Sequence, residues 1–373
     1  MRRALITGGA GFIGSHLARE LLRHGWAMRA LDSLVPEVHG ERRARPAYLD
    51  DAVELQVGDV RDRAAVARAL DGDGGVDAVF HLAARVGVGQ SMYEIAEYTS
   101  VNGLGTAVLL EELTKKPRPL VVASSMSIYG EGLYRDAAGR LRAGAERTQA
   151  DLAAGRIEVY DERGERMEPV PTTEDKPPAL ASIYALGKYD QERMCLLAGR
   201  AYGFHAAALR LFNVYGPDQA LSNPYTGVLA IFGARLLNGR PPLVYEDGRQ
   251  RRDFVSVYDV ARAFRLALER PQANGRALNV ASGRSVNVLE IARLVAGAVG
   301  RPELTPEVSG KVRVGDIRHC FADVRAAEAL LGYRAEVPLE RGIAELAVWL
   351  RRQEAVDRVA DAQRELERRG LVR

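Results

Sequence analysis

The sequence predicts an α/β protein with a doubly wound parallel sheet and a smaller, mostly C-terminal α/β region. Three observations predict this fold class. Short apolar segments alternate with amphipathic segments up to residue 125, a glycine-rich turn follows the first apolar segment, and the alternation loosens after about residue 190. Parallel strands joined by helices are covered on both faces, so they read as nearly continuous apolar runs.

Each element of the first half has its own signal. Apolar runs that end near glycine, aspartate or serine predict strands, whereas helical periodicity of apolar residues predicts the segments between them. The first helix closes on Gly25, a residue type that commonly follows the last helical turn. The predicted strands cover 3–9, 27–33, 52–60, 76–84 and 119–125, and the predicted helices cover 12–25, 63–70 and 102–115.

The first turn places Gly8, Gly11 and Gly14 between a predicted strand and a predicted helix. A pyrophosphate binds bare backbone amides at a helix N-terminus, and a Cβ at these positions would hold the phosphates away. The alternative is a glycine-rich turn without a ligand, and two carboxylates argue against it. Asp32 ends the second predicted strand, where it can accept hydrogen bonds from the adenosine ribose, and Asp59 ends the third. An acid at position 32 repels the 2′-phosphate of NADP, so we expect a Rossmann-type domain that binds NAD.

Composition excludes several other classes of protein. The 52 basic residues nearly balance the 49 acidic ones without a block of like charge, so we expect no nucleic-acid partner. Cys195 and Cys320 lie far apart without a CxxC partner, so neither a disulfide framework nor a metal site is indicated. Glycines interrupt the N-terminal apolar run, and no stretch reaches the ~18 apolar residues of a membrane span, so we expect a cytoplasmic protein.

Seven motifs, taken in order, carry a resemblance to a known family: "ITGGAGFIG", "HLAA", "SSMSIYG", "YALGK", "RLFNVYGP", "RRDFVSVYDVA" and "NVASG". Over nearly its whole length the chain resembles the extended short-chain dehydrogenase/reductase family, in particular its NAD-dependent nucleotide-sugar epimerase/dehydratase group. The resemblance implies cofactor contacts at Gly8, Gly11, Phe12, Ile13, Gly14, Asp32, Asp59, Val60, Leu82, Ala83, Ala84, Asn102, Tyr184 and Lys188. It also implies a homodimer.

The resemblance further implies a catalytic triad of Ser125, Tyr184 and Lys188. The four-residue spacing puts Tyr184 and Lys188 on one helix face, although such pairs are common by chance. A free phenol titrates near pH 10, so a base at neutral pH needs a pKa lowered by about 3 units, worth about 4 kcal/mol. The lysine ammonium and a positively charged nicotinamide ring would supply this shift together. Ser125 would hydrogen-bond the reacting hydroxyl group.

Three matched positions are expected to support the site. Asn102 should hold the chain around the nicotinamide more than act chemically, although it is counted above among the cofactor contacts. His81 should pack or hydrogen-bond, and Tyr129 should line the cleft.

The chain departs from the family pattern between Ser125 and Tyr184, where the gap is much longer than usual. Residues 131–178 are charged and poor in apolar side chains, so we expect a surface insertion or flap. The resulting domain prediction is a NAD-binding domain over 1–190, a nucleotide-sugar region over 191–350 that interleaves with it, and a solvated C-terminal helix over 351–373.

The second half carries the positions that match the family's grip on a nucleotide diphosphate sugar. Asn213 matches an amide that contacts a phosphate, and Arg252 and Arg313 match arginines that bind the diphosphate. Two guanidinium groups suit a diphosphate because each makes paired charge-assisted hydrogen bonds. Residues 219–232 should enclose the nucleobase, which is thymine or uracil. The predicted substrate contacts are Ser125, Met126, Ser127, Asn213, Arg252 and Arg313.

The two residues after Ser125 point to the type of reaction. Dehydratases of this family carry an Asp-Glu pair there, whereas this chain has Met126 and Ser127, which cannot protonate a leaving hydroxyl. The Ser-x-x-x-Tyr form is typical of the 4-epimerases, and the motifs around 212–232, 245–255 and 315–320 are similar to the dTDP-L-rhamnose 4-epimerase group. A nucleotide-sugar reductase, a decarboxylase and a non-catalytic NAD-binding protein remain as alternatives.

Overall fold

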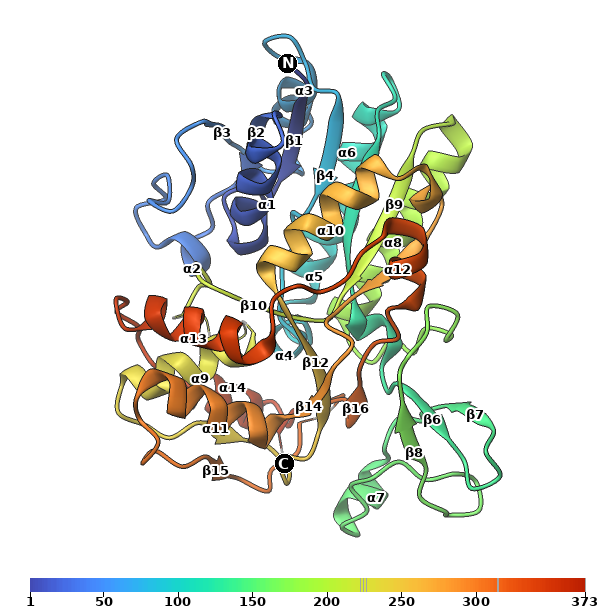
Figure 1. Ribbon diagram of the computed structural model, residues 1–373, viewed down its shortest axis with the longest axis vertical. Coiled ribbons are helices and arrows are strands. Elements are labelled where there is room, and N and C mark those ends of the chain that lie inside the picture. The colour runs from blue at the N-terminus through green and yellow to red at the C-terminus, as the bar shows by residue number, and fades with distance from the viewer. Residues whose placement is uncertain (222, 224, 226, 314, 373) are drawn as a thin grey trace.

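The computed structural model describes residues 1–221, 223, 225, 227–313 and 315–372. Seven parallel strands form its main sheet, in the order β13-β9-β5-β4-β1-β2-β3 (Figure 1). Their bounds are β1 Arg3–Thr7, β2 Ala27–Asp32, β3 Val53–Val57, β4 Ala78–His81, β5 Leu120–Ser125, β9 Ala206–Leu211 and β13 Ala277–Val280. This confirms the doubly wound sheet. The strand order reverses between β1 and β4, and ligands bind at such a switch point.

Helices cover both faces of this sheet and enclose two separate apolar cores. One face carries α1 Phe12–Arg23, α10 Val257–Glu269 and α12 Arg325–Leu331, and the other carries α3 Arg63–Asp71, α6 Gly105–Leu113 and α8 Ile183–Tyr202. Shorter turns follow the strand ends: α2 Pro36–His39, α4 Val88–Ser91, α5 Ile95–Tyr98, η1 Thr99–Leu104, η2 Met126–Tyr129 and η3 Pro271–Ala273. Because the seven strands are parallel, the side chains at their C-terminal ends meet along one edge of the sheet.

A smaller α/β unit lies below this edge in Figure 1. Its strands are β10 Asn213–Tyr215, β12 Arg251–Ser256, β14 Ser285–Asn287 and β16 His319–Cys320, with a separate pair of β11 Leu243–Val244 and β15 Glu307–Val308. Its helices α9 Val228–Leu237, α11 Val288–Val299 and α13 Leu339–Leu350 share a third apolar core. The boundary predicted at residue 190 falls inside α8, because this helix continues along the main sheet. Strands β9 and β13 come from the second half of the chain and complete that sheet.

The insertion after β5 has more structure than the predicted flap. Strands β6 Leu133–Arg135, β7 Leu141–Ala143 and β8 Glu168–Val170 form a three-stranded antiparallel sheet, and α7 Gln149–Ala153 lies beside it at the lower right of Figure 1. Tyr134, Val159 and Met167 are buried and form a small apolar core of their own. The insertion thus buries enough apolar surface to be ordered despite its charged composition.

The C-terminal segment corrects the prediction of a solvated helix over 351–373. Helix α13 ends at Leu350, and the last helix, α14, covers only Val359–Arg368. Leu366 on α14 is 5% exposed, because one side of this charged helix is apolar and packs against the protein. Within the described part of the chain, no helix is both long and apolar enough to cross a membrane.

Candidate active site

The glycine turn after β1 leaves no room for side chains. Gly8 has a φ of +71°, and a Cβ added to it would lie 2.9 Å from the backbone nitrogen of Ala83. A Cβ on Gly14 would lie 2.4 Å from the carbonyl oxygen of Gly8, so α1 can approach β1 this closely only with glycine there. The first turn of α1 lines the cavity at the switch point, and the first amides of a helix have no partners within it. This cradle fits the pyrophosphate of a dinucleotide.

The two predicted carboxylates lie in the same cavity but have different partners. Asp32 accepts hydrogen bonds from the backbone amides of Ala10 at 3.0 Å and Leu34 at 2.9 Å. Asp32 therefore holds the loop after β1 and the loop after β2 in place, and it lines the cavity where the adenosine ribose is expected. Asp59 is bound by the guanidinium group of Arg61, and this hydrogen bond lowers the pKa of the carboxyl group.

Most of the predicted cofactor contacts line this cavity, whose volume is about 500 Å³. They are Gly8, Gly11, Phe12, Ile13, Gly14, Asp32, Asp59, Val60, Leu82, Ala83, Ala84, Tyr184 and Lys188. Ser125 lines the cavity too, at its inner end.

Ser125, Tyr184 and Lys188 meet at the inner end because β5 ends there and α8 begins there. The Oγ of Ser125 accepts hydrogen bonds from the amide of Ser127 at 3.2 Å and from its hydroxyl at 2.9 Å. The Ser125 side chain also interacts with the Tyr184 side chain and acts to lower the pKa of that tyrosine. The amide of Tyr184 donates to the Oγ of Ser91 at 3.0 Å, which fixes the first turn of α8.

Burial shifts the two ionisable members of the triad in opposite directions. It raises the pKa of Tyr184, and the interaction with Ser125 only partly opposes this shift. It lowers the pKa of Lys188 to about 8. The Nζ of Lys188 donates to the Oε1 of Gln191 at 2.8 Å. The lowered tyrosine pKa that the sequence argument requires is therefore not produced by the protein groups around the hydroxyl.

A second cavity, of about 370 Å³, meets the first at Ser125, Tyr184 and Asn213, which line both. All six predicted substrate contacts line it: Ser125, Met126, Ser127, Asn213, Arg252 and Arg313. The Oδ1 of Asn213 is buried and has no hydrogen-bond partner among the described residues. A buried amide oxygen without a partner is costly, so this atom points to a ligand.

The two arginines are held at the other end of this second cavity. The guanidinium of Arg252 donates to the carbonyl oxygens of Ile317 and Arg318, the latter at 3.0 Å. The guanidinium of Arg313 stacks 4.6 Å from the ring centroid of Tyr245 and pairs with Asp316 at 3.1 Å. The protein therefore holds both guanidinium groups in position before a diphosphate binds. Of the predicted segment 219–232 around the nucleobase, residues 222, 224 and 226 lie outside the described residues.

Comparison with known proteins settles the family. Residues 4–281 match the model of the NAD dependent epimerase/dehydratase family. The chain belongs to that family. This confirms NAD as the cofactor and confirms the family expected from the motifs.

Individual relatives of this epimerase/dehydratase chain cover nearly its full length. It is 35% identical to a dTDP-L-rhamnose 4-epimerase of Burkholderia thailandensis, over 94% of this chain and 95% of the relative. It is 31% identical to a UDP-glucose 4-epimerase of Mycolicibacterium smegmatis, over 94% and 98%. Among solved structures, a Thermus thermophilus UDP-glucose 4-epimerase in complex with NAD matches with a TM-score of 0.73 and 30% identity, over 94% and 99% of the two chains.

Two residues predicted near the site of this family member lie elsewhere. Asn102 is buried outside the cofactor cavity, where its side-chain amide accepts from the amide of Arg85 at 2.7 Å and donates to its carbonyl at 3.1 Å. It shapes the loop after β4 and does not line the cavity. Tyr129 does not line the cleft; it is fully buried and donates to the Oδ1 of Asn279 at 2.7 Å. His81 hydrogen-bonds Thr7 and Thr106, as expected.

The residues that hold the helix of Tyr184 and Lys188 in place carry no motif in the sequence. Glu192, four residues after Lys188, pairs with Arg210 of β9 at 2.7 Å and accepts from the hydroxyl of Ser124 at 2.6 Å. All three side chains are buried. The available signal was an acid on the inward face of α8 and an arginine inside an otherwise apolar strand, because such groups are buried only when paired.

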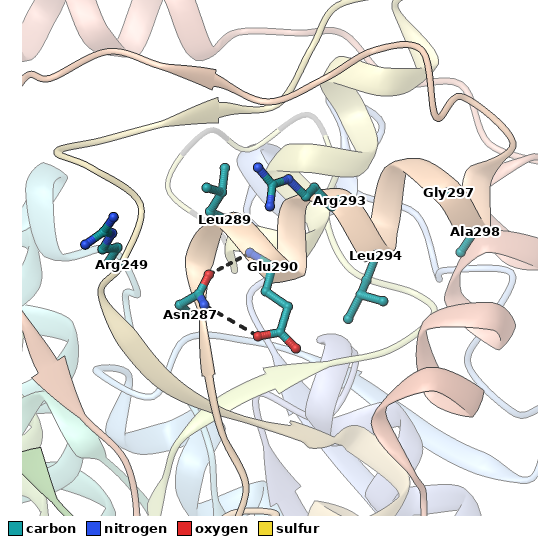
Figure 2. A pocket seen from close by; sticks show the side chains of 8 residues that line it. All are labelled: Arg249, Asn287, Leu289, Glu290, Arg293, Leu294, Gly297 and Ala298. Carbon is teal, nitrogen blue, oxygen red and sulfur yellow. Dashed lines mark hydrogen bonds between the residues drawn. The ribbon is translucent and has the colours of Figure 1, made fainter.

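A third hollow lies on the outer side of α11 and holds none of the predicted site residues (Figure 2). Two of its polar side chains, Asn287 and Glu290, are engaged with the start of the helix. Asn287 caps α11 by accepting from the amide of Glu290 at 2.7 Å, and the Glu290 carboxylate faces back toward the Asn287 amide (Figure 2). This arrangement explains Asn287 and Glu290 as a helix cap.

Proposed function

We propose that the protein is an NAD-dependent 4-epimerase of a nucleotide diphosphate sugar, with a dTDP-6-deoxyhexose such as dTDP-L-rhamnose favoured. One observation carries this proposal: the cavity that holds Tyr184 beside the cofactor cradle continues into a cavity that ends at two arginines. A sugar with C4 at Ser125 and Tyr184 can therefore extend its diphosphate toward Arg252 and Arg313.

Each member of the triad has a defined task. Tyr184 takes the proton from the C4 hydroxyl and later returns it, and Ser125 holds the hydroxyl by its hydrogen bond. Lys188 lies one helical turn from Tyr184 and orients the nicotinamide ribose. Bound NAD would supply the hydride acceptor for C4, so that loss of the hydride and of the hydroxyl proton would leave a 4-keto sugar, and epimerisation would follow when the hydride returns to the opposite face of C4. The positive charge of the bound nicotinamide would favour the tyrosinate. The raised pKa of Tyr184 suits the opposite step, in which the tyrosine gives its proton back.

Several observations favour epimerisation over the other reactions of the family. Met126 and Ser127 follow Ser125 and line the substrate cavity, and neither can act as the acid that a dehydration needs. The similarity to the Burkholderia thailandensis dTDP-L-rhamnose 4-epimerase supports a dTDP-linked 6-deoxyhexose over a UDP-linked sugar. A reductase or decarboxylase would use the same triad, and these remain the second candidates.

Isotope labelling separates these reactions. The enzyme is incubated with a panel of dTDP- and UDP-sugars without added NAD, and the best substrate is then prepared with deuterium at C4. We expect the C4 label to remain at C4 in the epimer, because hydride leaves and returns to the same carbon.

Tyr184→Phe keeps the ring but loses the proton-transferring group, so we expect turnover to fall by about 100-fold or more with the fold intact.

Other outcomes identify the alternatives. Label at C6 with solvent deuterium at C5 would indicate a dehydratase, and released carbon dioxide would indicate a decarboxylase. A stoichiometric need for free NAD(P)H would indicate a reductase. Any of these results would contradict the 4-epimerase proposal.

A further inference from the structure

We propose that residues 351–372, with α14 at their centre, form a lid over the nucleotide-sugar cavity and supply the apolar wall that selects a 6-deoxy sugar. This inference rests on the proposed function, because it concerns the substrate of that same site. It assigns a role to a segment whose composition alone indicated only a solvated helix.

One side of the segment lines the substrate cavity. Val359, Ala362, Gln363, Leu366 and Leu371 line it together with Ser125, Tyr184 and the two arginines. The exposed charges of α14 pair with one another on its outer side, as Arg364 does with Asp361. The helix thus presents its apolar side to the cavity and its charged side to water.

Contacts on both sides of the cavity hold the segment across it. At the diphosphate end, Val372 forms an antiparallel backbone bridge with Arg313, and Glu367 pairs with Lys311 at 2.6 Å. At the other end, the guanidinium of Arg369 lies 4.3 Å from the ring centroid of Tyr93. A closed segment therefore covers the route by which a nucleotide sugar would enter.

The same contacts suit a part that opens and closes. The segment is attached at its base, where the side chain of Asn238 donates to the carbonyl of Ala355 at 2.8 Å and Arg240 pairs with Asp357 at 3.1 Å. Beyond the base, Leu366 and Val372 are its buried anchors, and its ion pairs are largely exposed. Exposed ion pairs contribute little to stability, and segments with few buried contacts open locally at low cost.

Leu366 places the apolar wall at the sugar end. Its two terminal carbons lie 3.3 and 3.5 Å from the point where a Cβ on Gly89 would sit, so leucine packs directly on that glycine. Gly89 belongs to α4, whose Ser91 accepts the amide hydrogen bond of Tyr184. Leu366 therefore packs against α4, the helix that adjoins Tyr184, and C4 of the sugar must lie at Tyr184.

The wall around that end favours a methyl group at C6 of the sugar. It consists of Val88, Gly89, Met92, Met126 and Leu366. C6 is attached to the carbon next to C4, so its substituent reaches this wall when C4 lies at Tyr184. The side chains of this wall offer a hydroxyl or carboxylate no hydrogen bond in exchange for its lost water, whereas a methyl group needs none. Among the described residues that line the cavity, the cationic side chains are Arg252 and Arg313, and both belong to the diphosphate end.

Hydrogen exchange on the NAD-loaded enzyme tests the lid without requiring turnover. The probes are dTDP-L-rhamnose and dTDP, and the amides of 359–372 are followed by mass spectrometry. We expect dTDP-L-rhamnose to slow their exchange at least tenfold, with less protection from dTDP alone. Unchanged exchange with a probe that binds by calorimetry would overturn the lid. If the segment is protected but no sugar in the panel is epimerised, the lid stands and the proposed function fails.

A substitution tests the wall. We compare kcat/KM for dTDP-L-rhamnose with that for dTDP-L-mannose, which differs only by the hydroxyl at C6. Leu366→Ser should reduce the preference for the 6-deoxy sugar at least tenfold, with NAD content unchanged. The matched control is Arg364→Ala on the outer side of the same helix, where the side chain is 72% exposed, and it should leave the ratio unaltered. An unchanged ratio in Leu366→Ser, or an equal change in both variants, would overturn the wall. If Leu366→Ser folds poorly, Leu366→Met serves as a second variant and should keep the preference.

Discussion

Lys188 and Tyr184 show what burial does to the chemistry of single residues. Removal from water disfavours the charged form of each, so the pKa of the amine falls and that of the phenol rises. The protein alone therefore leaves Tyr184 protonated at neutral pH, and Lys188 close to titration. A base can be produced from this pair only when further positive charge is added beside it, which couples proton transfer to occupation of the cofactor cradle.

The lowered pKa of Lys188 predicts a pH dependence of stability. A free lysine titrates near pH 10.5, and burial holds the pKa of Lys188 at about 8. Between pH 8 and pH 10.5 the unfolded chain keeps a proton that the folded protein has released. The free energy of unfolding therefore increases as the pH rises through this range. In nucleotide-free protein, the stability of the wild type relative to Lys188→Met should increase from pH 8 to pH 10.5. Urea unfolding of both proteins across this pH range measures the difference between their free energies of unfolding. A difference that stays constant with pH would contradict the prediction.

Helix α8 brings the triad to its place as one element. It carries Tyr184 and Lys188 at its start and Glu192 one turn later, and the buried Glu192–Arg210 pair joins it to β9. Because Ser124 of β5 also donates to Glu192, the pair sets the position of α8 relative to the strand that carries Ser125. The distance between the two hydroxyl groups of the triad thus depends on an ion pair outside the cavity.

This ion pair predicts a strong non-additivity in stability. Arg210→Met leaves the carboxylate of Glu192 buried without its partner, which should cost about 3–5 kcal/mol. The double variant Glu192→Gln with Arg210→Met removes both charges and should be less destabilised than Arg210→Met alone. Denaturant unfolding of the wild type, Arg210→Met, Glu192→Gln and the double variant completes this double-mutant cycle. Additive effects would show that the two groups act independently.

Across the whole molecule, the insertion joins the two halves through buried charges. Arg318, which is fully buried, pairs with Glu158 of the insertion at 2.6 Å and with Glu246 at 2.9 Å. Arg147 of the insertion pairs with Glu246 at 2.9 Å and donates to the carbonyl of Asp316 at 2.9 Å. Asp316 is the partner of Arg313, so the insertion supports the loop that carries Arg313, the arginine proposed to bind the diphosphate.

A substitution in the insertion should therefore change substrate binding from outside the cavity. Arg147→Ala removes the support of the Asp316 carbonyl, and we expect KM for the nucleotide sugar to rise about tenfold, or ~1.4 kcal/mol, with kcat and NAD content little changed. The control is Arg142→Ala, because the ion-pair partner of Arg142 among the described residues is Asp136, which also belongs to the insertion. Steady-state kinetics measure both. A fall in kcat at constant KM would contradict a role in substrate binding.

The parts of the fold that sequence alone could predict are those set by local chemistry. The glycine turn, the strand ends at Asp32 and Ser125, and the four-residue spacing of Tyr184 and Lys188 are all short-range patterns. Period and turn chemistry act within a few residues, so the strands of the first half and the cofactor cavity followed from them. Motif order then indicated Asn213, Arg252 and Arg313, which line one cavity in the structure.

Other features depend on contacts between segments that are distant in the chain. Local patterns were enough to predict a doubly wound sheet with a dinucleotide cradle and a tyrosine–lysine pair. They could not show that Tyr129 is buried away from the cleft, that the charged insertion docks through Arg147 and Arg318, or that Leu366 of α14 lines the second cavity. A charged segment reads as solvated unless its partners are known, and those partners lie far along the chain. Burial and charge pairing are properties of the packed molecule, and here they separate surface residues from those that shape the site.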